Sequence, residues 1–346
     1  MWIRSSVKSL SSKLQYPLVG IIILTLILLC LPLLWLQDYA VSPGPDTGDN
    51  ATIVHIPGAT SLGEIENILA GQSLIRSDIR FKLLALMLGS AGSLKAGHYK
   101  IPAGSAPVDI LRRLEKGDIV RYQLTVPEGY TVQQIGRKLE KKFGYRQEEF
   151  RRLCHDSALI RSLGLEVKGL EGYLFPDTYG LNIDMPLKSL IRDMVQRFQE
   201  VYDGLLPQEE DSDTYSLSRH EIVTMASIVE KETSLPAERP LVASVLSNRL
   251  RKNMRLQADP TVFYGVNKNG GNLNADDLTY DTPYNSYIYK GLPPGPICNP
   301  GRASLEAALR PARTSYLYFV ARKDGGHEFS LNLREHINAV NRFQRD

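Results

Sequence analysis

The segment EIVTMASIVEKET, residues 221–233, combines an apolar helical pattern with two carboxylates that could act as proton donors. Four apolar residues follow the i, i+3, i+4, i+7 spacing of one buried helical face: Ile222, Met225, Ala226 and Val229. Ser218, three residues before Glu221, predicts a capping box at the start of the helix. An advance of about 100° per residue places Glu230 and Glu232 on opposite flanks of the apolar face. The two carboxylates are therefore expected to have different neighbours.

Glu230 is predicted to lie at the margin of the core. It shares its flank with Val223 and Ala226, which are small enough to leave room for a ligand. A half-buried carboxyl group in such a position has a raised pKa and can donate a proton near neutral pH. The alternative is a solvated residue that pairs with a nearby arginine, and the spacing alone favours that alternative.

Residues 282–301, TPYNSYIYKGLPPGPICNPG, are rich in tyrosine, asparagine and proline. The prolines exclude a regular helix or a central strand, and they lower the entropy cost of ordering a long loop. Aromatic rings with hydroxyl groups, together with side-chain amides, offer a stacking surface and neutral hydrogen-bonding groups for a sugar. A rigid structural loop over a sheet edge explains the composition equally well.

Several other chemistries are excluded by the absence of their motifs. The chain has no H-E-x-x-H motif, zinc-binding cluster, G-x-S-x-G elbow, P-loop or dinucleotide fingerprint. Its 41 basic and 38 acidic residues are too evenly balanced to indicate a nucleic-acid partner. We therefore expect no metal and no cofactor.

Residues 17–36, PLVGIIILTLILLCLPLLWL, carry no charge and are long enough to cross a bilayer, at about 30 Å for 20 helical residues. Basic residues precede this stretch and the first acid, Asp38, follows it, which predicts a cytoplasmic N-terminus. A cleaved signal peptide is the alternative, but the apolar run is long and Asp38 stands where cleavage needs a small residue. Cys154 and Cys298 could pair in an oxidising compartment or remain unpaired.

The remaining chain is predicted to be α+β. A weak repeat of strand, turn and amphipathic helix joins residues 53–69 and 123–139, where Thr131 suits a helix N-cap. The run 208–216 is predicted to be a surface loop. The predicted divisions are a tail at 1–16, a membrane helix at 17–36, a flexible linker at 37–51, a small α+β module at 52–121, a connecting part at 122–217 and a catalytic core at 218–346.

Six sequence blocks resemble the signatures of the YceG-like family of membrane-bound endolytic murein transglycosylases. The blocks are ASIVEKE (226–232), SNRL (247–250), RLQADPTVFYG (255–265), PYNSY (283–287), GLPPGPICNPG (291–301) and YLYFVA (316–321). They occur in order through the C-terminal region, and the resemblance extends to the anchor and to the small module, which is similar to a LysM-like domain. The resemblance implies a LysM-like module followed by a mixed α/β catalytic domain.

The resemblance also implies an activity and a location. Such lyases cleave the β-1,4 bond between N-acetylmuramic acid and N-acetylglucosamine without water, which leaves 1,6-anhydro ends. The catalytic glutamate is expected at Glu230, as single general acid and base, with a structural role for Glu232. The implied partners are peptidoglycan strands and peptidoglycan synthases, and the catalytic domain is expected in the periplasm, anchored in the inner membrane by one helix. Seven residues are candidates for binding the glycan: Asn248, Gln257, Asp259, Tyr264, Tyr284, Asn285 and Asn299.

Two other functions remain open from the sequence. A water-using glycoside hydrolase would need a second carboxylate about 5–10 Å from the acid, and Asp259 is the nearest candidate by motif. A non-catalytic scaffold would bind glycan through the module at 52–121 and recruit wall-synthesis enzymes.

Overall fold

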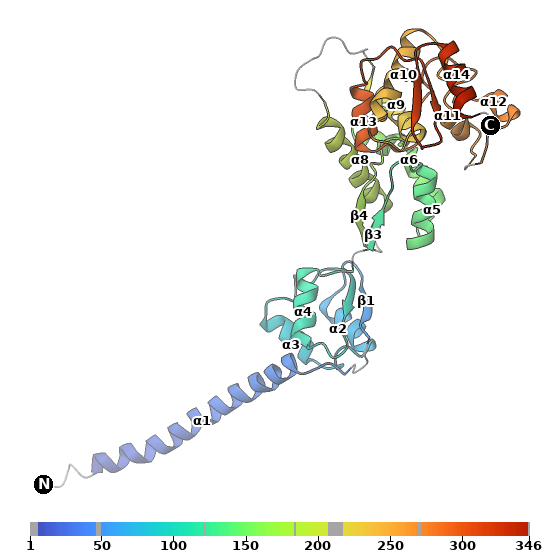
Figure 1. Ribbon diagram of the computed structural model, residues 1–346. Helices are drawn as coiled ribbons and strands as arrows, with labels where there is room; N and C mark the ends of the chain where they lie inside the picture. The colour runs from blue at the N-terminus through green and yellow to red at the C-terminus, as the bar shows by residue number, and fades with distance from the viewer. Residues whose placement is uncertain are drawn as a thin grey trace. The chain divides into compact units, whose positions relative to one another are not determined.

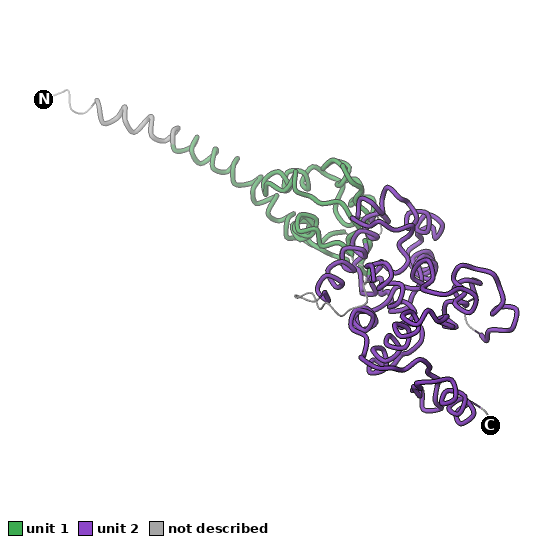
Figure 2. The backbone as a smooth tube through the Cα atoms, turned by 90° about the horizontal axis from the view of Figure 1, so that it is seen from above, with its two compact units in different colours: residues 1–122, 182–184 green, residues 123–181, 185–346 purple. Residues whose placement is uncertain are grey.

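The computed structural model describes residues 6–45, 50–120, 122–182, 185–206, 217–268 and 271–344, with only the backbone given for residues 6–18. The chain divides into two compact units (Figure 2). Unit 1 holds residues 1–122 with 182–184, and unit 2 holds residues 123–181 and 185–346.

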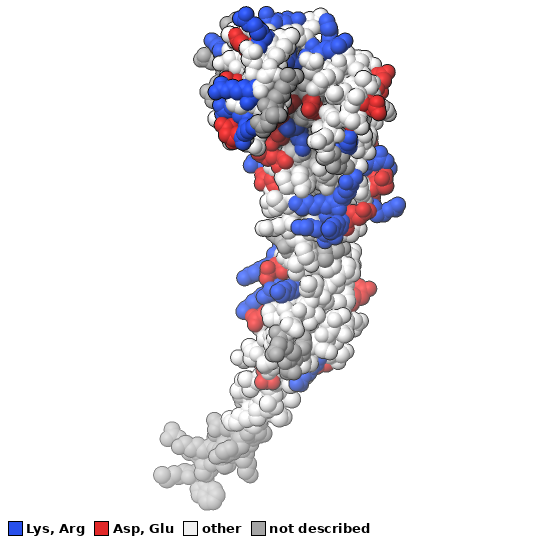
Figure 3. All heavy atoms as spheres, turned by 45° about the vertical axis from the view of Figure 1, so that its right-hand side comes forward, with Lys and Arg blue, Asp and Glu red and all other residues white. Residues whose placement is uncertain are grey.

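Unit 1 begins with a long helix, α1 (Ser6–Val41). Within the described chain, its stretch Val19–Val41 is the one helix long and apolar enough to cross a membrane. The apolar side chains from Val19 to Leu34 are largely exposed, as lipid-facing residues would be, and Figure 3 shows this part of the surface without charged groups. The helix runs five residues beyond the end predicted at residue 36.

A two-stranded sheet and three helices complete unit 1 (Figure 1). Strands β1 (Thr52–Ile56) and β2 (Gly97–Ile101) pair antiparallel, with Val54 opposite Tyr99. The helices are α2 (Leu62–Gly71), α3 (Arg80–Met87) and α4 (Pro107–Lys116). Their buried faces form one core with the inner side chains of the sheet.

The last turn of α1 belongs to this core, which differs from the predicted linker at 37–51. Leu36, Tyr39 and Ala40 are buried among the residues of unit 1. Gly44 donates a backbone hydrogen bond to the carbonyl of Ser105, and a side chain at Gly44 would collide with the carbonyl of Leu74. The apolar residues that follow the predicted span are thus packed into unit 1, because burying them costs less than exposing them to water.

The first part of unit 2 pairs strand β3 (Tyr122–Thr125) with β4 (Thr178–Leu181). Its helices are α5 (Val132–Phe143), α6 (Gln147–Cys154), α7 (Ser157–Ser162) and α8 (Leu187–Asp203). Thr131 is the N-cap of α5 and forms a capping box with Gln134, which confirms the predicted helix start.

The rest of unit 2 is built around α9 (Arg219–Glu232), which packs against α10 (Arg239–Arg251) and α13 (Arg302–Leu309) (Figure 1). The remaining elements are α11 (Asp259–Gly265), α12 (Ala275–Thr279), β5 (Tyr318–Ala321), β6 (His327–Ser330) and α14 (Leu333–Phe343). Strands β5 and β6 form an antiparallel pair that packs against α14.

Most predicted elements of unit 2 are confirmed, including α9, α10, α13, β5 and α14. The turn predicted around Pro260 is instead the first turn of a short helix, where a proline fits because its missing N–H has no intrahelical partner. Cys154 and Cys298 are both buried and unpaired. The loop predicted at 208–216 lies outside the described residues.

Candidate active site

Helix α9 positions both candidate glutamates in its last turn. The predicted capping box is present: the Ser218 hydroxyl accepts from the Glu221 N–H at 3.3 Å, and Glu221 accepts from the Ser218 N–H at 2.8 Å. Residues 223–229 are buried between α10 and α13. The helix end is thereby fixed, and Glu230 and Glu232 face different parts of unit 2, as predicted from their spacing.

Glu230 is held by groups that begin α13. Its Oε2 accepts hydrogen bonds from the Gly301 N–H at 3.0 Å and from the Ser304 hydroxyl at 2.7 Å. Gly301 is the N-cap of α13 and Ser304 is its third residue, so the carboxylate binds the positive end of that helix. These bonds give Glu230 a clear structural role at the α9–α13 contact.

Arg239 completes the surroundings of Glu230. Its Nη2 lies 3.3 Å from Glu230 Oε1 and 3.5 Å from Glu128 Oε2. The side chains of Glu230 and Arg239 are only 6% and 9% exposed, so the pair is buried rather than solvated. Burial raises the pKa of Glu230, while the bonds from Gly301, Ser304 and Arg239 oppose that rise. The arginine pairing that the sequence offered as an alternative is therefore present.

Glu232 is the last residue of α9 and faces a cavity. Across the described part of the chain, no hydrogen bond or ion pair holds its carboxylate. Burial, reinforced by the negative charge of Asp259 and opposed by Arg249, raises the pKa of Glu232 to about 8. The negative end of the α9 dipole also disfavours ionisation of a carboxyl at this position. The raised pKa favours the protonated form of Glu232 at neutral pH, and the carboxyl group lines the cavity.

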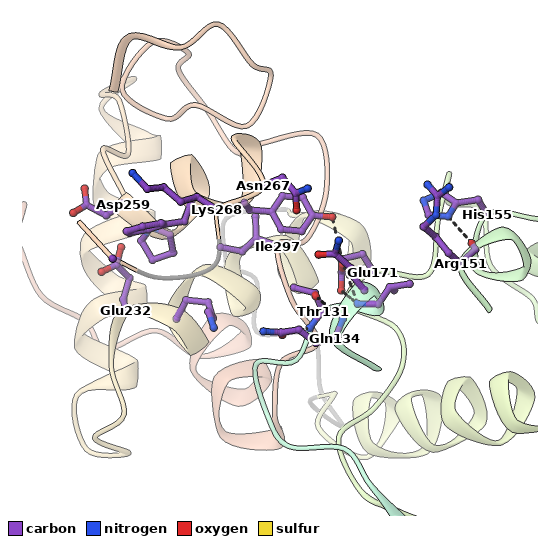
Figure 4. Close-up of a pocket in the computed structure, with 17 residues that line it drawn as sticks. Thr131, Gln134, Arg151, His155, Glu171, Glu232, Asp259, Asn267, Lys268 and Ile297 are labelled. Carbon is purple, nitrogen blue, oxygen red and sulfur yellow. Dashed lines mark hydrogen bonds between the residues drawn. The ribbon is translucent and has the colours of Figure 1, made fainter. Parts of the chain in front are cut away.

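Two cavities of unit 2 meet at Glu232 and Asp259. The larger has a volume of about 830 Å³ and the smaller about 450 Å³, and both residues line each of them. Figure 4 shows Glu232 and Asp259 together at one end of the larger cavity, with Thr131, Gln134 and Glu171 toward the other. A chain molecule could therefore occupy space on both sides of these carboxyl groups.

Aromatic residues line both cavities, as a sugar-binding cleft requires. Phe263 and Tyr264 lie along the larger cavity, whereas Tyr287, Tyr318 and Phe319 lie along the smaller one. Ring faces of this kind can stack on the apolar faces of sugar rings on either side of Glu232.

Asp259 is the second carboxylate at the junction of the cavities. It accepts a hydrogen bond of 2.5 Å from the Tyr287 hydroxyl. Tyr287 belongs to the proline-rich loop at 282–301, and its own pKa is raised by burial and by the Asp259 bond. The loop therefore orients Asp259, whose charge in turn favours the protonated form of Glu232.

Glu171 is a cavity residue that the sequence analysis did not identify. It accepts hydrogen bonds from the Val132 N–H at 3.0 Å, from the Asn299 amide at 3.2 Å and from the Tyr264 hydroxyl at 3.4 Å. Burial raises its pKa to about 8, against the effect of the donated bonds. The segment GLEGYLFPDTYGL (169–181) places this acid between Leu170 and Gly172, beside glycine and aromatic residues, and an acid in such apolar surroundings is the signal that could have identified Glu171.

The seven predicted glycan-binding residues fall into two groups. Gln257, Asp259 and Tyr264 line the cavities, and Tyr284 packs on Tyr264 with ring centres 4.8 Å apart. The three asparagines are buried and bond internally: Asn248 to the carbonyls of Thr314 and Tyr316, Asn285 to those of Leu278 and Tyr280, and Asn299 to that of Tyr130 and to Glu171. The structure does not bring these three amides to the cavity surface.

Basic and polar residues at the cavity rim were also missed. The larger cavity is lined by Lys231, Lys268, Arg151 and His155, together with Asn267. Lys268 is paired with Asp277 at 2.6 Å, and Arg151 with Glu148 at 2.8 Å. Such side chains could contact the carboxylates of a peptide-substituted glycan. Among the described residues, no group of three or more His, Cys, Asp or Glu is placed to hold a metal ion.

The sequence of the chain matches a known protein family. The profile of the YceG-like family matches residues 54–342, and the chain therefore belongs to this family.

Relatives of known name support that membership. The chain is 34% identical over 309 residues to the endolytic murein transglycosylase of Bacillus subtilis (strain 168), with 84% of each chain covered. It is 31% identical over 325 residues to the protein of that name from Streptococcus pneumoniae serotype 2 (strain D39 / NCTC 7466), covering 83% of this chain and 58% of that one. A crystal structure of a putative yceG-like protein from Listeria monocytogenes superposes with a TM-score of 0.57 at 32% identity, covering 84% of this chain and all of the other.

Proposed function

We propose that the protein is an endolytic murein transglycosylase, a lyase that cleaves the β-1,4 bond between N-acetylmuramic acid and N-acetylglucosamine inside peptidoglycan strands. The proposal is supported by membership of the YceG-like family and by relatives named endolytic murein transglycosylase. The observation that carries it is the position of Glu232, a carboxyl group with a raised pKa, where two aromatic-lined cavities meet. An enzyme that cuts within a strand needs room for sugar units on both sides of its acid.

We propose Glu232, rather than Glu230, as that acid. The sequence resemblance pointed to the block ASIVEKE, which contains both residues, and the prediction of Glu230 rested on that block. Glu230 has its two oxygens engaged by Gly301, Ser304 and Arg239, whereas Glu232 lines the cavities. A carboxyl that donates a proton to a glycosidic oxygen must face space that the substrate can enter, as Glu232 does.

The chemistry that follows needs one carboxyl group. Protonated Glu232 donates its proton to the oxygen that leaves with N-acetylglucosamine as the bond from C1 of N-acetylmuramic acid breaks. The 6-hydroxyl of the same N-acetylmuramic acid attacks C1, and its proton passes to the Glu232 carboxylate. The acid is regenerated, a 1,6-anhydro end forms, and no water is consumed. Asp259 supports the step by raising the pKa of Glu232.

The products of the full-length protein test this function. We expect mass spectrometry of digested glycan strands to show new ends one water lighter than hydrolysis products, formed at internal bonds. Fully hydrated ends would identify a hydrolase, for which Asp259 stands near enough to interact with Glu232. The absence of any cleavage would favour the scaffold.

The pH profile gives a second prediction. The active form carries a proton on Glu232, so activity should fall as pH rises through about 8. Asp259→Asn removes a charge that raises this pKa, and the alkaline limb should move to lower pH by about 0.5–1 unit. Asp276→Asn, an equal change of charge at an exposed site on α12, serves as the control and should leave the limb in place. An unmoved limb in Asp259→Asn would contradict the proposed coupling.

We further propose the location and the module. The apolar stretch of α1 serves as a single inner-membrane anchor, and the basic residues before it favour a cytoplasmic N-terminus, with unit 2 in the periplasm. The order β1-α2-α3-β2, with its antiparallel strand pair, supports the LysM-like interpretation of unit 1.

A further inference from the structure

Helix α3 of unit 1 carries an apolar stripe on its outer face. We call the following residues, with their exposed fractions, the α3 stripe: Ile79 60%, Leu83 38%, Leu86 62% and Met87 55%. Ile79, Leu83, Leu86 and Met87 recur at i, i+4, i+7 and i+8, so they share one side of the helix. This continuous row is longer than the scattered single apolar residues of an ordinary surface.

The opposite face of α3 already supplies the core contacts of unit 1. Phe81, Leu84 and Ala85 are at most 1% exposed and pack in the core cluster. Helix α3 is thus apolar on both faces, although it lies at the surface of the unit. A helix of this kind is expected where a second apolar phase covers the outer face.

The position of the membrane surface along α1 indicates that the apolar phase next to α3 is lipid. Trp35, 49% exposed, stands near the end of the apolar span, where aromatic side chains mark the boundary between lipid and water, and Tyr39, one turn later, is buried in unit 1. The guanidinium of Arg80, at the start of α3, lies 5.2 Å from the Trp35 ring centre and 4.4 Å from that of Tyr39. Helix α3 therefore begins at the height of the membrane surface, beside α1 (Figure 1).

The charges of α3 do not oppose contact with lipid. Arg80 is paired with Asp78 at 2.5 Å, and Lys82 with Glu66 at 2.8 Å. Both cations are neutralised within unit 1, so the α3 stripe contains no unpaired charge that would have to be desolvated.

We propose that the α3 stripe inserts into the interfacial layer of the bilayer that α1 crosses, on the side where α1 ends. Unit 1 then has two contacts with one membrane, a spanning helix and an interfacial helix. This insertion rests on the proposed membrane anchor, because the bilayer that α1 crosses is then the apolar phase next to the α3 stripe.

A site-specific fluorophore tests the insertion in the full-length protein, reconstituted in vesicles of phosphatidylcholine and phosphatidylglycerol. An NBD label would be placed at Leu86→Cys in a Cys30→Ala background, since Cys154 and Cys298 are buried. Lys100→Cys, exposed on β2, is the matched label outside α3. A label at the natural Cys30 reports separately on the anchor.

Insertion predicts a blue-shifted emission at position 86 and loss of most of its intensity to lipids brominated near the headgroup, with little loss at position 100. Water-like emission at 86, while Cys30 reports hydrocarbon, would overturn the insertion but leave the anchor intact. Blue-shifted emission at 86 that brominated lipid does not quench would also overturn it and indicate a protein partner. Water-like emission at Cys30 would refute the anchor, and the insertion with it.

Discussion

Replacing Glu232 by glutamine is expected to lower the rate of glycan cleavage by about 10²–10⁴-fold, the usual contribution of a general acid. Glutamine preserves the shape of the side chain but cannot donate a proton to the leaving oxygen. Because no hydrogen bond or ion pair of the described chain holds the Glu232 carboxylate, the substitution should leave the cavity walls in place. Initial rates of anhydro-end formation by the full-length protein would measure the loss.

Glu230→Gln is the matched variant, two residues earlier on the same helix. We expect it to retain activity within about tenfold of the wild type, after correction for the folded fraction by circular dichroism, because Glu230 bonds to α13 and Arg239 rather than to the cavity. A loss at Glu230→Gln as large as that expected at Glu232→Gln, with Glu232→Gln active, would return the acid to Glu230.

The sequence predicts the helix that carries Glu230 and Glu232, but not which residues surround each carboxyl group. Helical periodicity and the capping box at Ser218 predicted α9, and the 100° advance predicted that Glu230 and Glu232 face different neighbours. The identity of those neighbours depends on Gly301 and Ser304, some 70 residues later in the chain. Local patterns carry no information about that approach, so they could not decide which carboxyl lines the cavity.

The residues predicted to bind the glycan show a second limit of prediction from sequence, namely that residue type does not reveal burial. Tyrosine and asparagine are chemically suited to sugars, and the composition of residues 282–301 therefore pointed to binding. Backbone carbonyls in irregular loops also need donors, and the Asn285 amide serves those of Leu278 and Tyr280. Residue type alone cannot separate the two uses, whereas burial does.

The end of α1 is a third feature that the sequence alone does not predict. Hydropathy predicts an apolar helix whose uncharged run ends at residue 36, before the acid Asp38, whereas α1 continues to Val41. Tyr39 and Ala40 continue the helix because unit 1 buries them. Tertiary contacts, not local propensity, decide where this helix ends.

The two glutamine variants should also change stability in opposite directions, and Glu230→Gln should destabilise unit 2. It leaves the guanidinium of Arg239, 9% exposed, with Glu128 as its remaining carboxylate at 3.5 Å. Removing one partner of a buried pair strands the other charge, at a cost of about 2–4 kcal/mol in the free energy of unfolding. Urea unfolding of the full-length protein in detergent, followed by far-ultraviolet circular dichroism, measures the change.

Glu232→Gln should instead stabilise unit 2 in a pH-dependent way. Folding raises the pKa of Glu232 from 4.5 to about 8, so the wild type gains most from this residue below pH 4.5 and loses that gain as pH rises toward 8. Glutamine does not ionise and suffers no such loss. The variant should therefore match the wild type near pH 4 and exceed its free energy of unfolding by about 4 kcal/mol at pH 8. Equal stabilities at both pH values would show that the Glu232 pKa is not raised, and a protonated acid at that position would then be excluded.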